Sequence, residues 1–104
     1  MTGSHPRHEL DNQLTHPVRL SIVAALADVQ HAEFALIRDS VEITESMLSK
    51  QVALLEETGY VRVEKGRVGR HARTWLSLTA DGRAAYRRHL NALRAIAGRD
   101  LTHP

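Results

Sequence analysis

The chain has 104 residues and contains no cysteine. Disulfide bonds, thiolate metal ligands and cysteine nucleophiles are therefore excluded. It has no run of about 18 apolar residues, so no segment has the character of a transmembrane helix. The first residues lack the apolar stretch of a signal peptide, which leads us to expect a cytoplasmic protein. The length suits one domain with a modest hydrophobic core.

The sequence also lacks the short motifs of common catalytic sites. There is no G-x-S-x-G nucleophile elbow, no H-E-x-x-H zinc motif and no phosphate-binding P-loop. Serine, histidine and aspartate all occur, but at no informative spacing. A chain this short leaves little room for a substrate cleft. We therefore do not expect an enzyme, and we expect no cofactor.

Seven histidines raise the question of a metal site, and they stand at positions 5, 8, 16, 31, 71, 89 and 103. Without cysteine, a zinc site would need histidines and carboxylates at ligand spacing. Asp100 and His103 could pair, with His89 a few turns earlier, but these residues form no tight cluster. Scattered surface histidines are the favoured interpretation, and a metal-sensing repressor is the weaker alternative.

The net charge is only +2, but it is unevenly distributed. Up to Gly59 the chain has four lysines and arginines against nine acids, and from Tyr60 onward it has ten against three. The first part is therefore acidic and the second strongly basic. Such an asymmetry points to a polyanionic partner, although a solvated basic helix would explain part of the excess.

Residues 44–59, TESMLSKQVALLEETG, have the pattern of a capped amphipathic helix. Thr44 is a residue type that caps helix starts, and Gly59 suits a left-handed position after the helix end. Aliphatic residues recur at i, i+4 and i+7, and these are Leu48, Val52 and Leu55. The opposite face has small or polar residues and one lysine. Such a helix fits a DNA major groove, although an ordinary surface helix has the same pattern.

Two shorter helices are predicted before this one. Pro17 suits the first turn of a helix, within an apolar terminal stretch at about 10–29. Residues 34–41 have the length and pattern of a second helix, preceded by a brief strand at 32–34. A tight turn at 41–43 then leads into the helix at 44–59. Two helices joined by a short turn, the second with a polar face, form the helix-turn-helix arrangement of DNA-binding proteins.

After Gly59 the hydrophobic pattern becomes alternating. Residues 60–64 and 74–78 alternate apolar and polar, and we expect them to form a β-hairpin around a loop at 65–73. That loop has no acid and four cationic residues, which are Lys65, Arg67, Arg70 and Arg73. A loose Gly-containing loop with several arginines suits contact with phosphates or insertion into the minor groove. A solvated charged hairpin tip is the alternative.

The last predicted helix follows Thr79, a capping residue type, and Asp81 lies in its first turn, where the helix dipole favours an acid. Gly98 would end it. Its apolar stripe consists of Tyr86, Leu90, Leu93 and Ala97, with Ile96 beside it. A long amphipathic helix at the end of so small a domain either pairs with a partner helix or packs on the first helix of its own chain.

Taken in order, these elements resemble winged helix-turn-helix transcriptional regulators of the MarR/ArsR kind. The string LSKQVALLEETGYV at 48–61 resembles the family's recognition helix and the first strand of its wing. The string TWLSLTADGR at 74–83 resembles the second wing strand and the next helix start, and HPVRL at 16–20 resembles the first helix of the small single-domain branch. The resemblance implies a mainly α fold with a small β-hairpin (α+β), with a three-helix core, a wing and a C-terminal dimerisation helix. We expect one domain at 10–97, a mobile tail at 1–9 and a second tail at 98–104.

The resemblance also implies which residues contact double-stranded DNA. Base contacts would come from the recognition helix, through Thr44, Glu45, Ser46, Ser49, Lys50 and Gln51. Contacts with the backbone or minor groove would come from the wing, through Lys65, Arg67, Arg70, His71 and Arg73. The chain departs from the family pattern at Gln51, where many relatives have histidine, and at Glu42 and Glu45, which oppose the approach of phosphates.

Members of the family usually act as homodimers through their terminal helices, which implies an interface with Leu20, Val23, Tyr86, Leu90, Leu93 and Ile96. A two-fold dimer prefers a pseudo-palindromic operator. An unidentified small effector would bind at this interface or in a crevice beside the recognition helix. The implied function is sequence-specific transcriptional regulation, with repression expected. The alternative is a winged helix used for protein contact, with the basic wing bound to an acidic partner.

Overall fold

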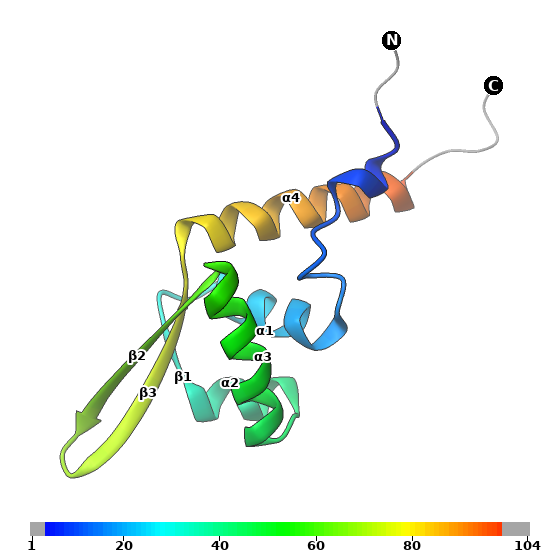
Figure 1. Cartoon of the computed structure of the whole chain (residues 1–104). Coiled ribbons are helices and arrows are strands. Elements are labelled where there is room, and N and C mark those ends of the chain that lie inside the picture. Colours follow the sequence, from blue (N-terminus) through cyan, green and yellow to red (C-terminus); the bar gives the residue numbers. More distant parts are fainter. Residues whose placement is uncertain (1–3, 99–104) are drawn as a thin grey trace.

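The computed structural model describes residues 4–98; residues 1–3 and most of the predicted C-terminal tail, residues 99–104, lie outside the described part (Figure 1). In chain order the elements are the 3-10 helix η1 (Pro6–Glu9), α1 (Pro17–Ala27), β1 (Ala32–Glu33), α2 (Phe34–Val41), α3 (Glu45–Thr58), β2 (Val61–Val68), β3 (His71–Leu78) and α4 (Ala80–Ala97). The expected α+β winged-helix architecture is confirmed.

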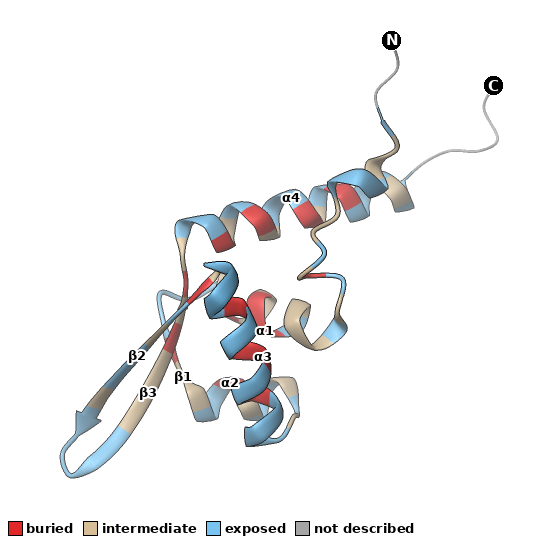
Figure 2. Ribbon diagram, in the orientation of Figure 1, coloured by how far each residue is buried: buried red, intermediate tan, exposed pale blue. Residues whose placement is uncertain are grey.

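The core lies where the three central helices meet the base of the hairpin. The strands form an antiparallel sheet in the order β1-β3-β2. Buried residues gather between α1, α3 and the hairpin base, while the outer half of the hairpin projects away from the helices (Figures 1 and 2). Fully buried aliphatic residues are Leu14, Ile22, Leu26, Leu48, Leu55 and Leu76. Each contributes about 1.5–3 kcal/mol by leaving water. The wing tip and the outer face of α3 lie outside this core and have no packing role in it.

Both predicted ends of α3 are confirmed. The Thr44 hydroxyl accepts the backbone N–H of Met47 at 3.1 Å, and Gly59 has φ 89° in the left-handed region. The turn before the helix has no glycine. Glu42 supplies the left-handed conformation there with φ 61°, which costs about 1 kcal/mol or more for a residue with a side chain. That conformation redirects the chain between α2 and α3 and completes the helix-turn-helix.

The hairpin is longer than predicted. Lys65 pairs with Thr74 and Val68 pairs with His71, so most of the expected loop at 65–73 is strand. Gly69 and Arg70 alone form the turn, and Gly69 has φ 62°, which favours glycine. The prediction was wrong because it required alternating apolar residues, whereas backbone hydrogen bonds continue an exposed ladder beyond the core. The wing is therefore a paired two-stranded arm and not a loose tip.

Residues 6–9, predicted to lie in a mobile tail, form η1 instead. Pro6 occupies its first turn, where the missing N–H has no consequence, and the His5 imidazole accepts the N–H of Arg7 at 3.0 Å. The short helix lies along the C-terminal half of α4 (Figure 1). The sequence-based expectation was wrong here because polarity and a proline were taken as signs of a tail.

The apolar stretch predicted at 10–29 is not one continuous helix. Residues 11–16 form turns and α1 begins at Pro17, with the His16 imidazole accepting the N–H of Val18 at 3.2 Å. The Asp11 side chain accepts the N–H of Gln13 at 2.8 Å, which satisfies the backbone without a helix. Leu14 is nevertheless fully buried, so this segment belongs to the core.

The start of α4 approaches the rest of the fold closely. Thr79 caps the helix as predicted, and its hydroxyl accepts the N–H of Gly82 at 2.9 Å. A Cβ atom on Gly82 would lie 2.2 Å from the carbonyl oxygen of Tyr60. Glycine therefore permits the first turn of α4 to cross directly over the end of α3, and this crossing sets the direction of the long helix.

Candidate nucleic-acid interface

The outer face of α3 is short, polar and exposed. Ser46, Ser49, Lys50 and Ala53 lie opposite the buried Leu48, Val52 and Leu55. Glu45 stands in the first turn, where the helix dipole favours an acid. Serine hydroxyls and a lysine ammonium hydrogen-bond base edges and phosphates, and small side chains let the helix axis come near a surface. This face has the shape and chemistry of a helix that enters a groove.

Gln51 does not belong to that face, which corrects one of the predicted base contacts. Its side chain is 4% exposed. The amide oxygen accepts a hydrogen bond from Nη1 of Arg19 at 2.9 Å, and the amide nitrogen lies 3.4 Å from Sδ of Met47. Position 51 follows Leu48 by three residues and precedes Leu55 by four, so helical geometry places it on the inner flank. The sequence pattern contained this signal, but the polarity of glutamine outweighed it.

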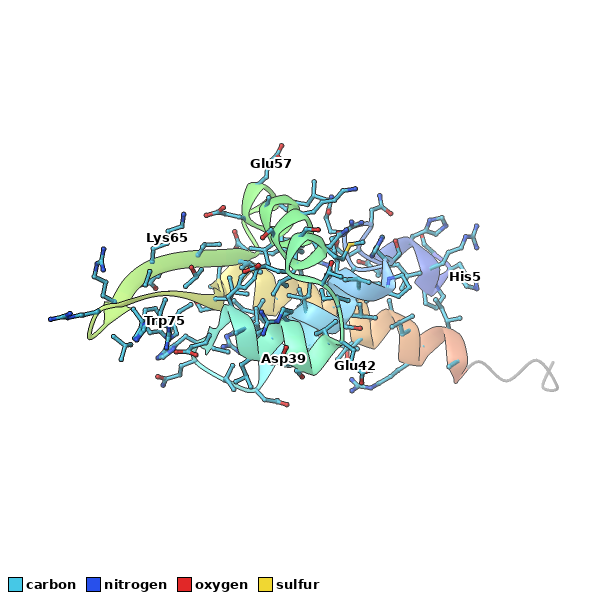
Figure 3. All side chains as sticks on the ribbon, turned by 90° about the horizontal axis from the view of Figure 1, so that it is seen from below. His5, Asp39, Glu42, Glu57, Lys65 and Trp75 are labelled. Carbon is cyan, nitrogen blue, oxygen red and sulfur yellow. The ribbon has the colours of Figure 1, made fainter. Side chains whose placement is uncertain are left out.

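The pleat of the wing divides its cationic residues between two faces. Cross-strand partners share a face, so the pairs Val63–Leu76 and Lys65–Thr74 lie on one side of the hairpin with Arg67. That side faces α3, because Val63 and Lys65 line a groove of about 360 Å³ with Ser49 of α3. Figure 3 shows Lys65 pointing to the side on which α3 lies.

The other wing face carries His71, Arg73 and Trp75, and Trp75 points away from Lys65 in Figure 3. Nε of Arg73 lies 3.4 Å from the carboxylate of Glu33, so part of its charge is neutralised within the chain. Arg70 stands at the turn and is exposed. The five predicted wing residues therefore do not form a single patch, and Lys65 and Arg67 lie on the α3 side.

Acidic residues border the same groove. Glu45 and Glu56 of α3 line it beside Lys65. Glu42, expected to oppose phosphates, is exposed in the turn before α3 (Figure 3). On α2, the carboxylate of Asp39 lies 2.9 Å from Nε of Arg38, and this pairing lowers the pKa of the carboxyl. Carboxylates at the groove favour contact with amino groups of bases over contact with phosphates, as when glutamate accepts from cytosine N4.

Some of the predicted dimer residues are buried in the core of their own chain, and others are partly or well exposed. Val23 is 1% exposed inside its own chain's core, so it is not available to a partner, which corrects that prediction. Leu20 and Tyr86 are half-buried and pack against the core. Leu93 is 37% exposed, whereas Leu90 and Ile96 are half-buried. The α4 positions that are buried are small residues and one histidine, namely Gly82, Ala85, His89 and Ala92.

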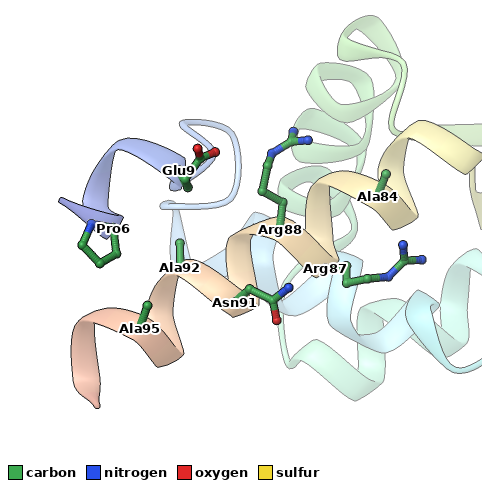
Figure 4. A pocket seen from close by; sticks show the side chains of 8 residues that line it. All are labelled: Pro6, Glu9, Ala84, Arg87, Arg88, Asn91, Ala92 and Ala95. Carbon is green, nitrogen blue, oxygen red and sulfur yellow. The ribbon is translucent and has the colours of Figure 1, made fainter. Parts of the chain in front are cut away.

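A second hollow runs along the other flank of α4. It measures about 380 Å³ and lies between η1 and the helix, with Pro6, Glu9, Ala92 and Ala95 on its walls (Figure 4). Arg87 and Arg88 stand toward its other end, and their guanidinium groups extend away from η1 (Figure 4). The hollow has an apolar floor with charge at its rim, and it is separate from the groove between α3 and the wing.

A buried polar cluster beside α4 was missed by the sequence-based reasoning. Nδ1 of His89 accepts the backbone N–H of Asp11 at 2.9 Å, and the Tyr60 hydroxyl donates to the Asp11 carboxylate at 2.5 Å. Burial lowers the pKa of His89, although the charge of Asp11 opposes this. Burial, with the hydrogen bond to Asp11, raises the pKa of Tyr60 to about 12. His89 was counted as a surface histidine, although it stands four residues after Ala85 and three before Ala92 on the inner stripe.

Residues 4–98 offer neither a metal site nor a membrane-spanning helix. No group of three or more histidines and carboxylates there is arranged to hold a metal ion, while Asp100 and His103 lie outside this range. Within the same range, no helix combines the length and hydropathy that a membrane crossing needs. The exposed face of α3 and the wing therefore remain the leading candidate site.

Comparison with known proteins identifies the family of the chain. Residues 18–97 match the family model described as a winged helix DNA-binding domain. An uncharacterized protein of Methanocaldococcus jannaschii is 27% identical over 73 residues, which are 70% of this chain and 79% of that protein.

Two solved structures are similar in fold and at 28% sequence identity. A transcriptional regulator homologue from Pyrococcus horikoshii OT3 superposes with a TM-score of 0.79, over 85% of this chain and 87% of that chain. A MarR family transcriptional regulator from Streptomyces coelicolor, solved in complex with DNA, has a TM-score of 0.65, over 93% of this chain and 68% of that chain.

The buried histidine makes stability depend on pH. Because the folded state lowers the pKa of His89, the unfolded chain binds a proton first as the pH falls below about 6.5. The free energy of unfolding should therefore decrease below that pH, and the loss should continue down to the folded pKa. In His89→Asn the side-chain oxygen still accepts a hydrogen bond but does not titrate, so this part of the decrease should vanish. Urea unfolding on both sides of about pH 6.5 measures the free energy of unfolding of each protein. An identical pH dependence in the unmodified protein and in His89→Asn would contradict the role given to His89.

Proposed function

The chain belongs to the winged helix DNA-binding domain family, and it shares its fold with a MarR family transcriptional regulator. From this we propose that it is not an enzyme and acts as a homodimeric, sequence-specific regulator. We further propose repression as its mode, because a protein bound at a promoter excludes other proteins from the same DNA. The observation that carries the proposal is the shared groove of α3 and the wing. Ser49 of the polar helix face and Lys65 of the wing line one groove, and Arg67 lies farther out on the same wing face.

In this proposal α3 enters the major groove and the wing follows the flanking backbone. Ser46, Ser49 and Lys50 are the base-reading candidates, with Glu45 at the groove edge and Thr44 at the helix start. Lys65, Arg67 and Arg70 would contact phosphates on the near side. His71 and Arg73, on the other wing face, would reach DNA only where the duplex passes around the arm.

The direct test is fluorescence anisotropy on DNA fragments from around the protein's own gene, compared with random duplex over a salt series. Tight binding to one fragment with a steep salt slope would support a sequence-specific regulator. Weak binding equal on all fragments would replace it with a nonspecific binder. No binding even at low salt would favour the protein-contact alternative, in which the basic wing binds an acidic partner.

The wing prediction uses the same assay. Replacing Arg67 and Arg70 together with alanine should weaken binding to specific and random DNA alike, because phosphate contacts are independent of sequence. The slope of log affinity against log salt should become shallower by about two, since each phosphate contact releases nearly one counterion. Arg62→Ala is the matched control, because it removes an exposed arginine of the same strand from the opposite wing face. An unchanged slope in the double variant would remove the wing from the proposal.

The dimer prediction concerns α4. Leu93 is 37% exposed, so Leu93→Arg should leave the folded chain intact while placing a charge in the proposed interface between two copies. Sedimentation analysis should then find a monomer of native secondary structure. Leu36→Arg is the control, because Leu36 is 62% exposed on α2, away from α4, and its replacement should leave the mass unchanged. A folded Leu93→Arg dimer would place the interface elsewhere.

A further inference from the structure

Arg19 of α1 joins the recognition helix to the segment before α1. Its Nε donates to the carbonyl oxygen of Gln13 at 2.8 Å, and its Nη1 donates to the amide oxygen of Gln51 at 2.9 Å. Gln51 is buried on the flank of α3. One guanidinium thus holds three parts of the chain in a fixed arrangement, and its planar geometry makes the arrangement directional.

The segment that Arg19 holds is itself anchored to α4. The N–H of Asp11 donates to His89 on α4 at 2.9 Å, and the Asp11 carboxylate accepts the N–H of Gln13 at 2.8 Å. The same carboxylate accepts the hydroxyl of Tyr60 at 2.5 Å. Since Tyr60 directly follows the Gly59 cap, α3 is tied to this segment at its middle and just beyond its end. A continuous hydrogen-bonded path therefore runs from α4 to the recognition helix.

Such a path matters because apolar packing alone fixes the rotation of a helix poorly. The stripe of Leu48, Val52 and Leu55 makes nondirectional contacts. A helix with its side chains has a radius of about 5–6 Å, so a rotation of about 20° displaces its outer side chains by roughly 2 Å. Hydrogen bonds to bases tolerate only a few tenths of an ångström. A directional bond on the flank of α3 can therefore fix the positions of the outer side chains of the helix.

We propose that Arg19 is a positioning residue for DNA recognition, which sets the rotation of α3 through Gln51 relative to a segment held on α4. This inference rests on the proposed function. It predicts that losing the Arg19–Gln51 bond reduces discrimination between sites, whereas contacts with phosphates are retained.

The experiment compares Arg19→Met with the matched control Arg83→Met. Arg83 also makes two hydrogen bonds that join separate elements, from α4 to the carbonyl oxygens of Ala27 and Val29, both at 2.8 Å. Neither of these bonds involves α3. The two variants therefore lose similar bonds and similar packing, but only one loses its connection to the recognition helix.

The measurement is the ratio of affinities for the specific fragment and for random duplex at one salt concentration. Arg19→Met should lower this ratio by about ten-fold, the scale of one good base contact, with binding to random duplex unchanged. Arg83→Met should keep the ratio within about two-fold. A ratio unchanged in Arg19→Met, or lowered equally in both variants, would overturn the inference. Arg19→Lys keeps the charge and reaches one of the two acceptors. Its affinity ratio should lie between those of the unmodified protein and Arg19→Met.

A second readout does not depend on DNA. Amide hydrogen exchange across residues 45–58 should accelerate in Arg19→Met more than in Arg83→Met, and equal exchange would overturn the inference. If the unmodified protein fails to discriminate between DNA sequences, the proposed function fails and this exchange comparison alone decides the positioning role. If Arg19→Met does not fold, Gln51→Met replaces it, because it removes the acceptor at nearly constant side-chain length and should give the same two results.

Discussion

The burial of one stripe on α3 is the constraint on which the other features depend. Leu48, Val52 and Leu55 are at most 5% exposed, and together they contribute several kcal/mol through the area they remove from water. Because these positions must face inward, Ser46, Lys50 and Ala53 must face outward. The caps at Thr44 and Gly59 end the helix within one turn of that stripe on each side. The polar face is thus a geometric consequence of the core, and its chemistry is free to vary without loss of stability.

The wing follows an equally strict rule with a different period. Register at the hairpin base is set by Val61 opposite Leu78 and Val63 opposite Leu76, all on the core side. Since the side-chain period of a strand is two, these pairs decide the face of every residue farther out. Lys65 and Arg67 lie on the α3 side because they continue the parity of Val61 and Val63. A slip of one residue would replace them on that side with Glu64 and Gly66, or with Gly66 and Val68 if the slip runs the other way.

The sequence allowed most of the fold to be predicted, because helix caps and hydrophobic periods are local signals. The starts and ends of α3 and α4 followed from Thr44, Gly59, Thr79 and Gly98, and α2 followed from the pattern of residues 34–41. The length of the two wing strands could not be predicted, because the residues that pair beyond Val63 show no apolar pattern. Gln51 and His89 were misplaced for a further reason. Helical spacing places both on an inner flank, but a polar side chain is buried there only because Arg19 or Asp11 hydrogen-bonds to it. These partners approach from elsewhere in the chain, and their approach has no local sequence signal.

The two faces of α4 serve different requirements. Its inner face passes over Tyr60 and lies against η1. This face carries Gly82, Ala85 and Ala92, because small residues permit a close approach. His89 lies on the same face and accepts a hydrogen bond from the backbone of Asp11. Small residues bury little apolar area, so this face holds the helix less firmly than a leucine stripe would. Tyr86, Leu90 and Leu93 lie on the neighbouring flank, where the chain only partly covers them. A partner helix on that flank would add the missing apolar burial and at the same time hold in place the His89–Asp11 contact from which the path to α3 begins.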